Sequence, residues 1–285
     1  MPDRTWTPLD LIGWTQGHFA RAGVDAPRLT AEVLLAHALR CDRVRLYLDF
    51  DKPLGEAELA RYRDLVRARA AGTPTAHLVG AREFYGRAFR VDPTVLVPRP
   101  ETELLVELAL PCLGPGSAAL DLCTGSGCVG ITLALERPGA TVLLTDVSTA
   151  ALQVARDNAA RLGAGVELRA GDLFAAAPDG ARFDVVTANP PYVPTSELAG
   201  LAREIHREPV LALDGGPDGT ALLARIVAEA PARLRPGGTL LVEVHESHAE
   251  RVPALCHSAG LVDVALHRDL AGLPRVVAAR AAAAK

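Results

Sequence analysis

One glycine-containing loop decides the fold of this chain, in the stretch Ala119-Leu120-Asp121-Leu122-Cys123-Thr124-Gly125-Ser126-Gly127-Cys128-Val129-Gly130. Apolar residues lead into the loop and follow it, which predicts a buried strand, a tight turn and a helix. Glycines there let backbone N–H groups and the helix N-terminus approach a ligand closely. The loop alone fits a nucleotide-binding site and a packing turn equally well.

Two aspartates follow the next two strands at positions that favour a nucleoside site. Asp146 ends one strand, where its carboxylate is placed to accept hydrogen bonds from both hydroxyls of a ribose. Asp172 follows the next strand and is placed to accept from an adenine amino group, while Leu173 covers the ring. Each aspartate alone is equally well explained as a helix cap. Because each follows the carboxyl end of a strand, the loop and the two aspartates together predict a bound nucleoside.

The chain after residue 117 alternates apolar runs with helical patterns. Such alternation is typical of a parallel sheet that is covered by helices on both faces. The last two apolar runs are expected to close the sheet as an antiparallel edge pair. We therefore predict an α/β fold with a Rossmann-like sheet. The expected strands are 118–122, 141–145, 166–169, 185–188 and 239–244, the helices 129–135, 150–162 and 221–234, and the edge pair 262–266 and 276–279.

The fourth strand ends in the tetrapeptide Asn189-Pro190-Pro191-Tyr192, at the edge where doubly wound sheets place their chemistry. An amide or aromatic amine is a poor nucleophile because its lone pair is delocalised. If its NH2 group donates to the Asn189 side-chain oxygen and the Pro190 backbone carbonyl, the lone pair is aimed at a methyl group. The prolines make this backbone rigid, and Tyr192 offers an aromatic face to a planar group.

The tetrapeptide therefore predicts methyl transfer from S-adenosylmethionine to a planar nitrogen. We expect Asn189, Pro190 and Tyr192 to be catalytic and the whole tetrapeptide, including Pro191, to bind the substrate. A proline turn with an aromatic staple is the alternative interpretation of the same residues. No general base is required, because the methylated nitrogen is cationic and loses its proton readily.

The first part of the chain has a different pattern, with apolar residues at helical spacing from Thr7 to about Gly72. We predict a small helical domain over residues 1–75 and a connector with a short hairpin over 76–100. The methyltransferase domain is expected to occupy 101–285, with a helix that begins near Glu101. Thr7 before Pro8 is a plausible helix cap.

Composition narrows the remaining possibilities. The 285 residues are 49% hydrophobic and 22% charged, which is typical of a globular protein with a sizeable core. A net charge of -4 argues against nucleic acid as a direct partner. Five cysteines without a CxxC pair argue against a disulfide framework or a structural zinc, and no metal is expected. No apolar leader or membrane-spanning run of ~20 residues is apparent, so we expect a cytoplasmic protein without a membrane partner.

Several polar residues outside these motifs are expected to be structural. His245 and His248 share a spacing compatible with one helical face, but they lack a third ligand and are expected to be a solvated polar stretch. Cys123 and Cys128 flank the loop and are expected to pack beneath the ligand. The charged residues after the tetrapeptide are expected to form an exposed helical face: Arg203, Glu204, Arg207 and Glu208.

The sequence closely resembles the peptide-chain release-factor glutamine N5-methyltransferases, also called PrmC or HemK. The resemblance spans nearly the whole chain and includes segments outside a general methyltransferase core, which distinguishes this family from the DNA aminomethylases. The segments that carry it are Ala26 to His37, Gly80 with Glu83 to Gly86, Val97 to Glu103, Asp121 to Gly127, Asn189 to Tyr192, Glu208-Pro209 with Gly215-Gly216, and Leu270 to Arg280.

The resemblance implies a class I methyltransferase fold and an enzyme that methylates the glutamine of a release factor's Gly-Gly-Gln loop. It also implies that the N-terminal helices help to dock the release factor. Separately, we expect the enzyme to be a monomer. The residues expected to bind S-adenosylmethionine are Asp121, Cys123, Thr124, Gly125, Ser126, Gly127, Asp146, Asp172, Leu173 and Asn189.

Four positions depart from the family pattern. Cys123 stands where the family usually has Gly, His77 where it often has Tyr, and His245 and His248 where a Gly and a Gln are common. The first departure is expected to narrow the loop without abolishing binding, and the last two concern substrate-side contacts. Three other functions remain open: methylation of a small molecule's amide or amine, methylation of adenine in nucleic acid, and a non-catalytic binding role.

Overall fold

The structure, a computed structural model, describes residues 5–283 and divides into two compact units. The smaller unit contains the residues up to Gly80 together with Ala202–Arg207, and the larger contains Ala81–Leu201 and the residues from Glu208 onward. The sequence predicts a connector over 76–100, whereas the structure groups residues 81–100 with the larger unit. Among residues 5–283, no helix combines the length and the hydropathy needed to cross a membrane.

The smaller unit is helical, and each helix follows from its local sequence. Helix α1 begins with a capping box, in which the Thr7 hydroxyl accepts from the Asp10 backbone N–H and the Asp10 carboxylate accepts from that of Thr7. Apolar residues of α1, α2 and α4 form its core, as the helical spacing predicts. The helices are α1 Pro8–Arg21, α2 Pro27–Leu39, α3 Arg43–Leu48, α4 Glu56–Ala70 and α5 Thr75–Val79.

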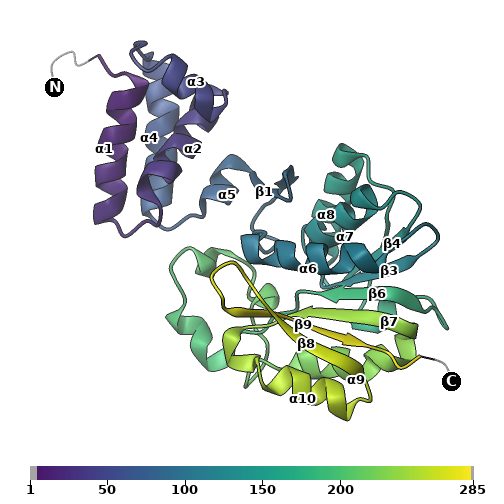
Figure 1. Cartoon of the computed structure of the whole chain (residues 1–285). Coiled ribbons are helices and arrows are strands. Elements are labelled where there is room, and N and C mark those ends of the chain that lie inside the picture. Colours follow the sequence, from purple (N-terminus) through teal and green to yellow (C-terminus); the bar gives the residue numbers. More distant parts are fainter. Residues whose placement is uncertain (1–4, 284–285) are drawn as a thin grey trace. The chain divides into compact units, whose positions relative to one another are not determined.

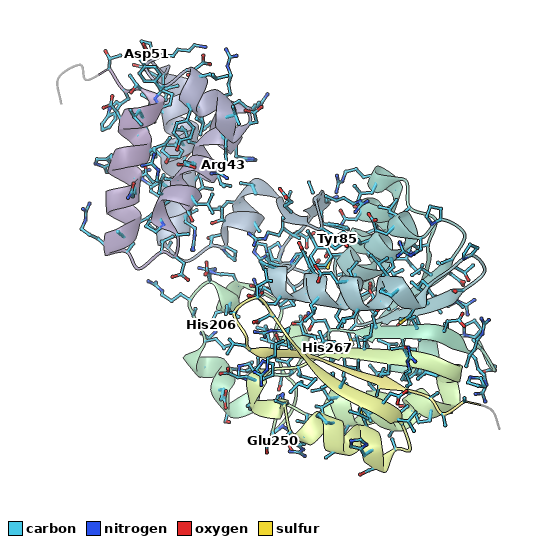
Figure 2. All side chains as sticks on the ribbon, in the orientation of Figure 1. Arg43, Asp51, Tyr85, His206, Glu250 and His267 are labelled. Carbon is cyan, nitrogen blue, oxygen red and sulfur yellow. The ribbon has the colours of Figure 1, made fainter. Side chains whose placement is uncertain are left out.

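A buried carboxylate ties α2 to α3 inside this unit. Glu32 is only 3% exposed, and it accepts hydrogen bonds from Arg43 at 2.8 Å and from the Tyr47 hydroxyl at 2.5 Å. Arg28 adds a third donor at 3.1 Å. Arg43, labelled in Figure 2, comes from the first turn of α3. Because a buried charge needs partners, these contacts fix α3 against α2.

The larger unit is built on a seven-stranded sheet with the order β5-β4-β3-β6-β7-β9-β8 (Figure 1). Strands β3 to β7 run parallel, and β9 pairs antiparallel with both β7 and β8, so the predicted antiparallel edge pair is confirmed. The strands are β3 Ala118–Leu122, β4 Thr141–Asp146, β5 Glu167–Ala170, β6 Phe183–Ala188, β7 Leu234–Glu243, β8 Val262–Arg268 and β9 Pro274–Arg280.

Helices cover both faces of this sheet, and Figure 1 shows α6, α7 and α8 on one face and α9 and α10 on the other. Neighbouring residues of β3 point to opposite faces: Leu120 packs in the core beneath α9 and α10, and Ala119 in the core beneath α6 and α7. The sequence pattern did not predict α10. The helices are α6 Glu103–Ala109, α7 Cys128–Glu136, α8 Thr149–Leu162, α9 Ala221–Arg233 and α10 Arg251–Ser258.

The predicted hairpin is present as β1 Ala81–Phe84 and β2 Arg87–Arg90, and it packs on the larger unit. Phe84 and Phe89 are almost fully buried in the core beneath α6 and α7. The Arg90 backbone N–H donates to the Asn158 side chain of α8 at 2.7 Å. Short 3-10 helices complete the unit at Pro100–Thr102, Leu110–Cys112, Leu173–Ala176, Thr195–Gly200, Val210–Ala212 and Glu246–His248.

The chain reverses its direction of travel across the sheet between β3 and β6. From β3 it proceeds to β4 and β5 on one side, then returns to place β6 and β7 on the other. The register pairs Leu122 with Ala188, so Cys123 and Asn189 both follow at the carboxyl edge. Doubly wound sheets bind their ligands at such a switch point.

Candidate active site

A cavity of about 290 Å³ opens at this switch point, and every residue that lines it belongs to the larger unit. Its volume lies near the lower end of ligand-binding pockets, which start at roughly 300 Å³. Of the ten residues predicted to bind cofactor, all except Gly127 line the cavity. The lining residues include Thr102, Asp121, Cys123, Thr124, Gly125, Ser126, Asp146, Asp172, Leu173, Asn189 and Pro191.

The carboxylate of Asp121 holds the glycine-containing loop in shape. It is 2% exposed and accepts from the hydroxyls of Thr124 at 2.6 Å and Thr187 at 2.7 Å, and from the Gly130 backbone N–H at 3.2 Å. Burial raises the pKa of Asp121 to about 6, although these three donors oppose the rise. Asp121 therefore joins β3, β6 and α7 beneath the cavity.

Two glycines of the loop are required by close packing. A side chain at Gly127 would meet Ile131 at 2.6 Å, and φ there is +82°. A side chain at Gly130 would meet Leu144 at 2.7 Å, so this glycine lets α7 lie against β4. Gly127 thus shapes the loop from behind the cavity wall.

Cys123 adopts a backbone conformation that normally favours glycine. Its φ is +54°, in the left-handed region, where an L-residue other than glycine is strained. Burial raises the pKa of its thiol, and the carboxylates of Asp146 and Asp121 raise it further, so the thiol stays protonated at neutral pH. A protonated, half-buried thiol fits the predicted packing role.

Asp146 ends β4 and points its carboxylate at the loop. One oxygen accepts from the Gly125 backbone N–H and the other from that of Ser148, both at 2.9 Å. Burial raises the pKa of Asp146, and these backbone donors lower it. Each carboxylate oxygen can accept a second hydrogen bond, so Asp146 fits a ligand that offers two hydroxyls.

Asp172 and Leu173 lie on the same wall but differ in burial. The Asp172 side chain is 56% exposed and pairs with Arg225 of α9 at 2.7 Å. Leu173 is 5% exposed and has a φ of +48°, which turns it into the core. An exposed ion pair of this kind contributes ~0–1 kcal/mol to stability, so Asp172 remains free to bind a ligand.

Asn189 follows β6 directly and stands half-buried in the cavity wall. Its side-chain NH2 group donates to the Thr102 hydroxyl at 3.2 Å. Pro191 also lines the cavity, whereas Pro190 and Tyr192 are not among the described lining residues. The Tyr192 ring lies 6.2 Å from the ring of exposed His245.

A second buried carboxylate lies behind this side of the cavity. Glu243, at the end of β7, is 1% exposed and accepts from the Thr102 hydroxyl at 2.7 Å and the Tyr192 hydroxyl at 3.3 Å. Burial raises the pKa of Glu243 to about 7, although the positive charge of Arg275 and the two hydroxyl donors oppose the rise. Burial, followed by the charge of Glu243, raises the pKa of Tyr192.

The segment before α6 forms another wall of the cavity. The sequence pattern predicts only a connector for this segment. Thr94, Val95, Leu96, Pro98 and Arg99 line the cavity. Glu208 secures this segment, because it accepts from the Val97 backbone N–H at 3.0 Å and from Arg99 at 2.6 Å.

The prediction of an exposed helical face after the tetrapeptide is therefore wrong for Glu208, which is 5% exposed. Glu204 is also engaged, in an ion pair with Arg69 of the smaller unit at 2.5 Å. Arg203 and Arg207 are exposed as expected, but the segment forms only a 3-10 turn at Ile205–Arg207. The cause is the distant partner of each glutamate, which local spacing does not reveal.

The two histidines after β7 also differ from expectation. His245 is exposed, but His248 is 5% exposed and packs against Gly219, so it does not belong to a solvated stretch. Within residues 5–283, no group of three His, Cys, Asp or Glu side chains is arranged to hold a metal ion.

A seven-stranded sheet with one antiparallel strand, a glycine loop after its first parallel strand and an Asn-Pro-Pro-Tyr edge defines a class I S-adenosylmethionine-dependent methyltransferase. Residues 10–80 match the PrmC N-terminal domain family, and residues 100–216 match the methyltransferase small domain family. The chain belongs to the release factor glutamine methyltransferase family.

Two relatives with that name show the extent of the similarity. The enzyme of Geobacter sulfurreducens is 44% identical over 276 residues, which cover 96% of this chain and 97% of the relative. The enzyme of Cereibacter sphaeroides is 46% identical over 268 residues, which cover 93% of this chain and 95% of the relative. The 16S rRNA methyltransferase RsmC of T. thermophilus, solved with AdoMet and guanosine, shares the fold alone, with a TM-score of 0.50 and 22% identity over 70% of this chain and 49% of RsmC.

Proposed function

We propose that this enzyme methylates the side-chain amide nitrogen of the glutamine in the Gly-Gly-Gln motif of a peptide chain release factor. The observation that carries the proposal is the match to release factor glutamine methyltransferases over nearly the full length of the chain, including the helical unit. A general methyltransferase core would match the larger unit only.

The donor set of the cavity fits S-adenosylmethionine, the methyl donor of this class. Asp146 would accept from the ribose hydroxyls, because each of its oxygens retains a lone pair after binding one backbone N–H. Leu173 and the exposed Asp172 carboxylate would receive the adenine. The loop from Cys123 to Ser126 would hold the methionine part beside the N-terminus of α7. Asp121 would shape that loop from the cavity wall, and Gly127 would shape it from behind the wall.

Substrate orientation is the task of the tetrapeptide. S-adenosylmethionine supplies a methyl group on a sulfonium that readily loses it to a nucleophile. The side-chain oxygen of Asn189 and the backbone carbonyl of Pro190 would accept the two N–H groups of the glutamine amide, which holds its nitrogen lone pair toward the methyl group. Bound S-adenosylmethionine would supply the methyl group to this nitrogen and keep the electron pair of the broken carbon–sulfur bond, and the surplus proton would pass from the nitrogen to water.

The helical unit would dock the release factor, while the larger unit performs the chemistry. We expect the enzyme to work as a monomer in the cytoplasm. Direct binding to nucleic acid is not expected, because the chain carries a net charge of -4.

The proposal is tested by incubating the enzyme with a bacterial release factor and methyl-labelled S-adenosylmethionine. Label should enter the release factor and should be absent from a matched factor in which the glutamine of the Gly-Gly-Gln motif is replaced by alanine. Equal labelling of both factors, or label found only in small molecules of a cell extract, would contradict the proposal.

A further inference from the structure

The side chain of Asn189 is a planar amide that can lie in two orientations related by a half-turn. One orientation presents its oxygen to the substrate and the other presents its NH2 group. Only the first suits a substrate that is itself an NH2 donor. A hydrogen-bond partner of Asn189 must therefore select that orientation, and this partner lies outside the tetrapeptide.

The selection can be followed through two hydrogen bonds. Thr102 has one hydroxyl hydrogen, which points to the Glu243 carboxylate at 2.7 Å. A carboxylate only accepts, so this hydrogen is committed, and the Thr102 oxygen can only accept from its other neighbour. That neighbour is Asn189, 3.2 Å away, and only its NH2 group can donate. The Asn189 oxygen is thereby left on the opposite side of the amide.

We propose that Glu243, acting through Thr102, is the positioning residue that sets the orientation of the Asn189 amide for methyl transfer. The inference rests on the proposed function for the chemistry it serves. Glu243 is not among the described residues that line the cavity, so its effect would be exerted through Thr102 and Tyr192. The Tyr192 hydroxyl donates to its other oxygen, so one carboxylate holds both ends of the tetrapeptide.

The protonation state of Glu243 gives this relay a pH dependence. A protonated carboxyl can donate to Thr102, which frees the threonine hydrogen to point at Asn189 and permits the wrong orientation. Burial raises the pKa of Glu243 to about 7, so the change falls in an accessible range. The charged and titratable groups that act on Glu243 include Arg275 of β9, Tyr192, Glu101 and Cys128 of α7.

Three substitutions test the relay. Glu243→Gln and Thr102→Val should each lower kcat by about tenfold, the effect of one lost orienting hydrogen bond. Thr102→Ser keeps the hydroxyl and should retain wild-type turnover. The matched control is Thr239→Val, a buried threonine of the same strand as Glu243 whose hydroxyl contacts the Cys112 sulfur at 3.7 Å. It should leave kcat unchanged.

Two further readouts separate positioning from a loss of structure. The dissociation constant for S-adenosylmethionine should stay within about threefold of wild type in Glu243→Gln, since Glu243 lies outside the cavity wall. The wild-type kcat should fall as pH drops through about 7, and Glu243→Gln should lack that step. An acid limb at the same pH in Glu243→Gln, or loss of turnover in Thr102→Ser equal to that in Thr102→Val, would overturn the proposal.

The orientation can also be measured without any substrate, so failure of the proposed function would leave this test intact. In isotope-labelled enzyme, the side-chain NH2 resonances of Asn189 are assigned by their loss in Asn189→Asp. They should shift as pH falls through about 7 in wild type. In Glu243→Gln they should show no such step. Asn189 NH2 resonances whose chemical shifts change neither with pH nor in Glu243→Gln would refute the relay.

Discussion

Two buried carboxylates stand beside the same cavity, and they are bonded differently. Asp121 receives a backbone N–H and two hydroxyls from its own loop and the adjoining strand, so it fixes backbone. Within the described part of the chain, Glu243 accepts hydrogen bonds from two hydroxyls, those of Thr102 and Tyr192, on the proposed substrate side. We infer that the proposed cofactor side, formed by the loop from Cys123 to Ser126 with Asp121 and Asp146 and here called the cradle, is held largely through its backbone. The proposed substrate side, in contrast, would depend on the charge of Glu243.

The largest effect is expected on the substrate side itself. Asn189→Ala removes the acceptor that aligns the glutamine amide and should lower kcat by roughly 100- to 1,000-fold, as loss of an oriented polar group does. Cofactor affinity, measured by calorimetry, should be partly retained, because Asp146 and the loop remain when the Asn189 contact is lost. A cofactor affinity that falls as steeply as kcat would contradict the division of the cavity into a cofactor side and a substrate side.

A change at Asp121 should act on the cradle and on folding. Asp121→Ala leaves two buried hydroxyls and the Gly130 N–H without their acceptor, which should lower the free energy of unfolding by about 2 kcal/mol. Cofactor affinity should fall with it, because the loop loses its anchor. Urea unfolding and calorimetry measure the two quantities. Asp157→Ala, which removes an exposed partner of Arg90, is the control and should cost less than ~1 kcal/mol.

The charge of Glu243 should also be visible in stability. Its pKa is raised above its ordinary value by burial, so the folded state holds a proton that the unfolded state releases. As pH rises from 4.5 to about 7, the free energy of unfolding of wild type, relative to that of Glu243→Gln, should therefore decrease by about 1 kcal/mol for each pH unit. Urea titrations from pH 5 to about 7 follow this difference. A constant difference would mean that Glu243 is already ionised throughout.

The smallest effect is expected at Cys123, where the cradle carries backbone strain. Cys123→Gly relieves the left-handed conformation at φ +54° but adds freedom to the unfolded chain, so the net gain in stability should be about 0.5–1 kcal/mol. Thermal unfolding gives the measurement. Cys128→Gly is the contrasting change, because that buried cysteine begins α7, and there glycine should destabilise.

The cradle could largely be predicted from the sequence, because its parts are local. The strand, loop and helix around Gly125, and the aspartate at the end of β4, follow from periodicity and spacing alone. Asn189 was placed for the same reason, at the end of a predicted strand. The structure brings these residues to one cavity at the carboxyl edge of the parallel strands.

The relay behind the substrate side could not be predicted, because its partners are remote in sequence. Thr102 lies 141 residues before Glu243, and Glu208 lies 111 residues after the Val97 N–H that it binds. Without knowledge of its remote partner, each glutamate would be predicted to be an ordinary surface charge. The available signal was weak: Glu243 directly follows the apolar run Leu240-Leu241-Val242, and a carboxylate buried there needs a partner.

Methylation of a glutamine amide nitrogen leaves a product that acid hydrolysis identifies. Release factor labelled by the enzyme is hydrolysed, which cleaves the side-chain amide to glutamate and an amine. The label should be released as methylammonium and should become volatile, as methylamine, when the hydrolysate is made alkaline. Label that remains on a non-volatile amino acid, as it would after methylation of arginine or lysine, would contradict it.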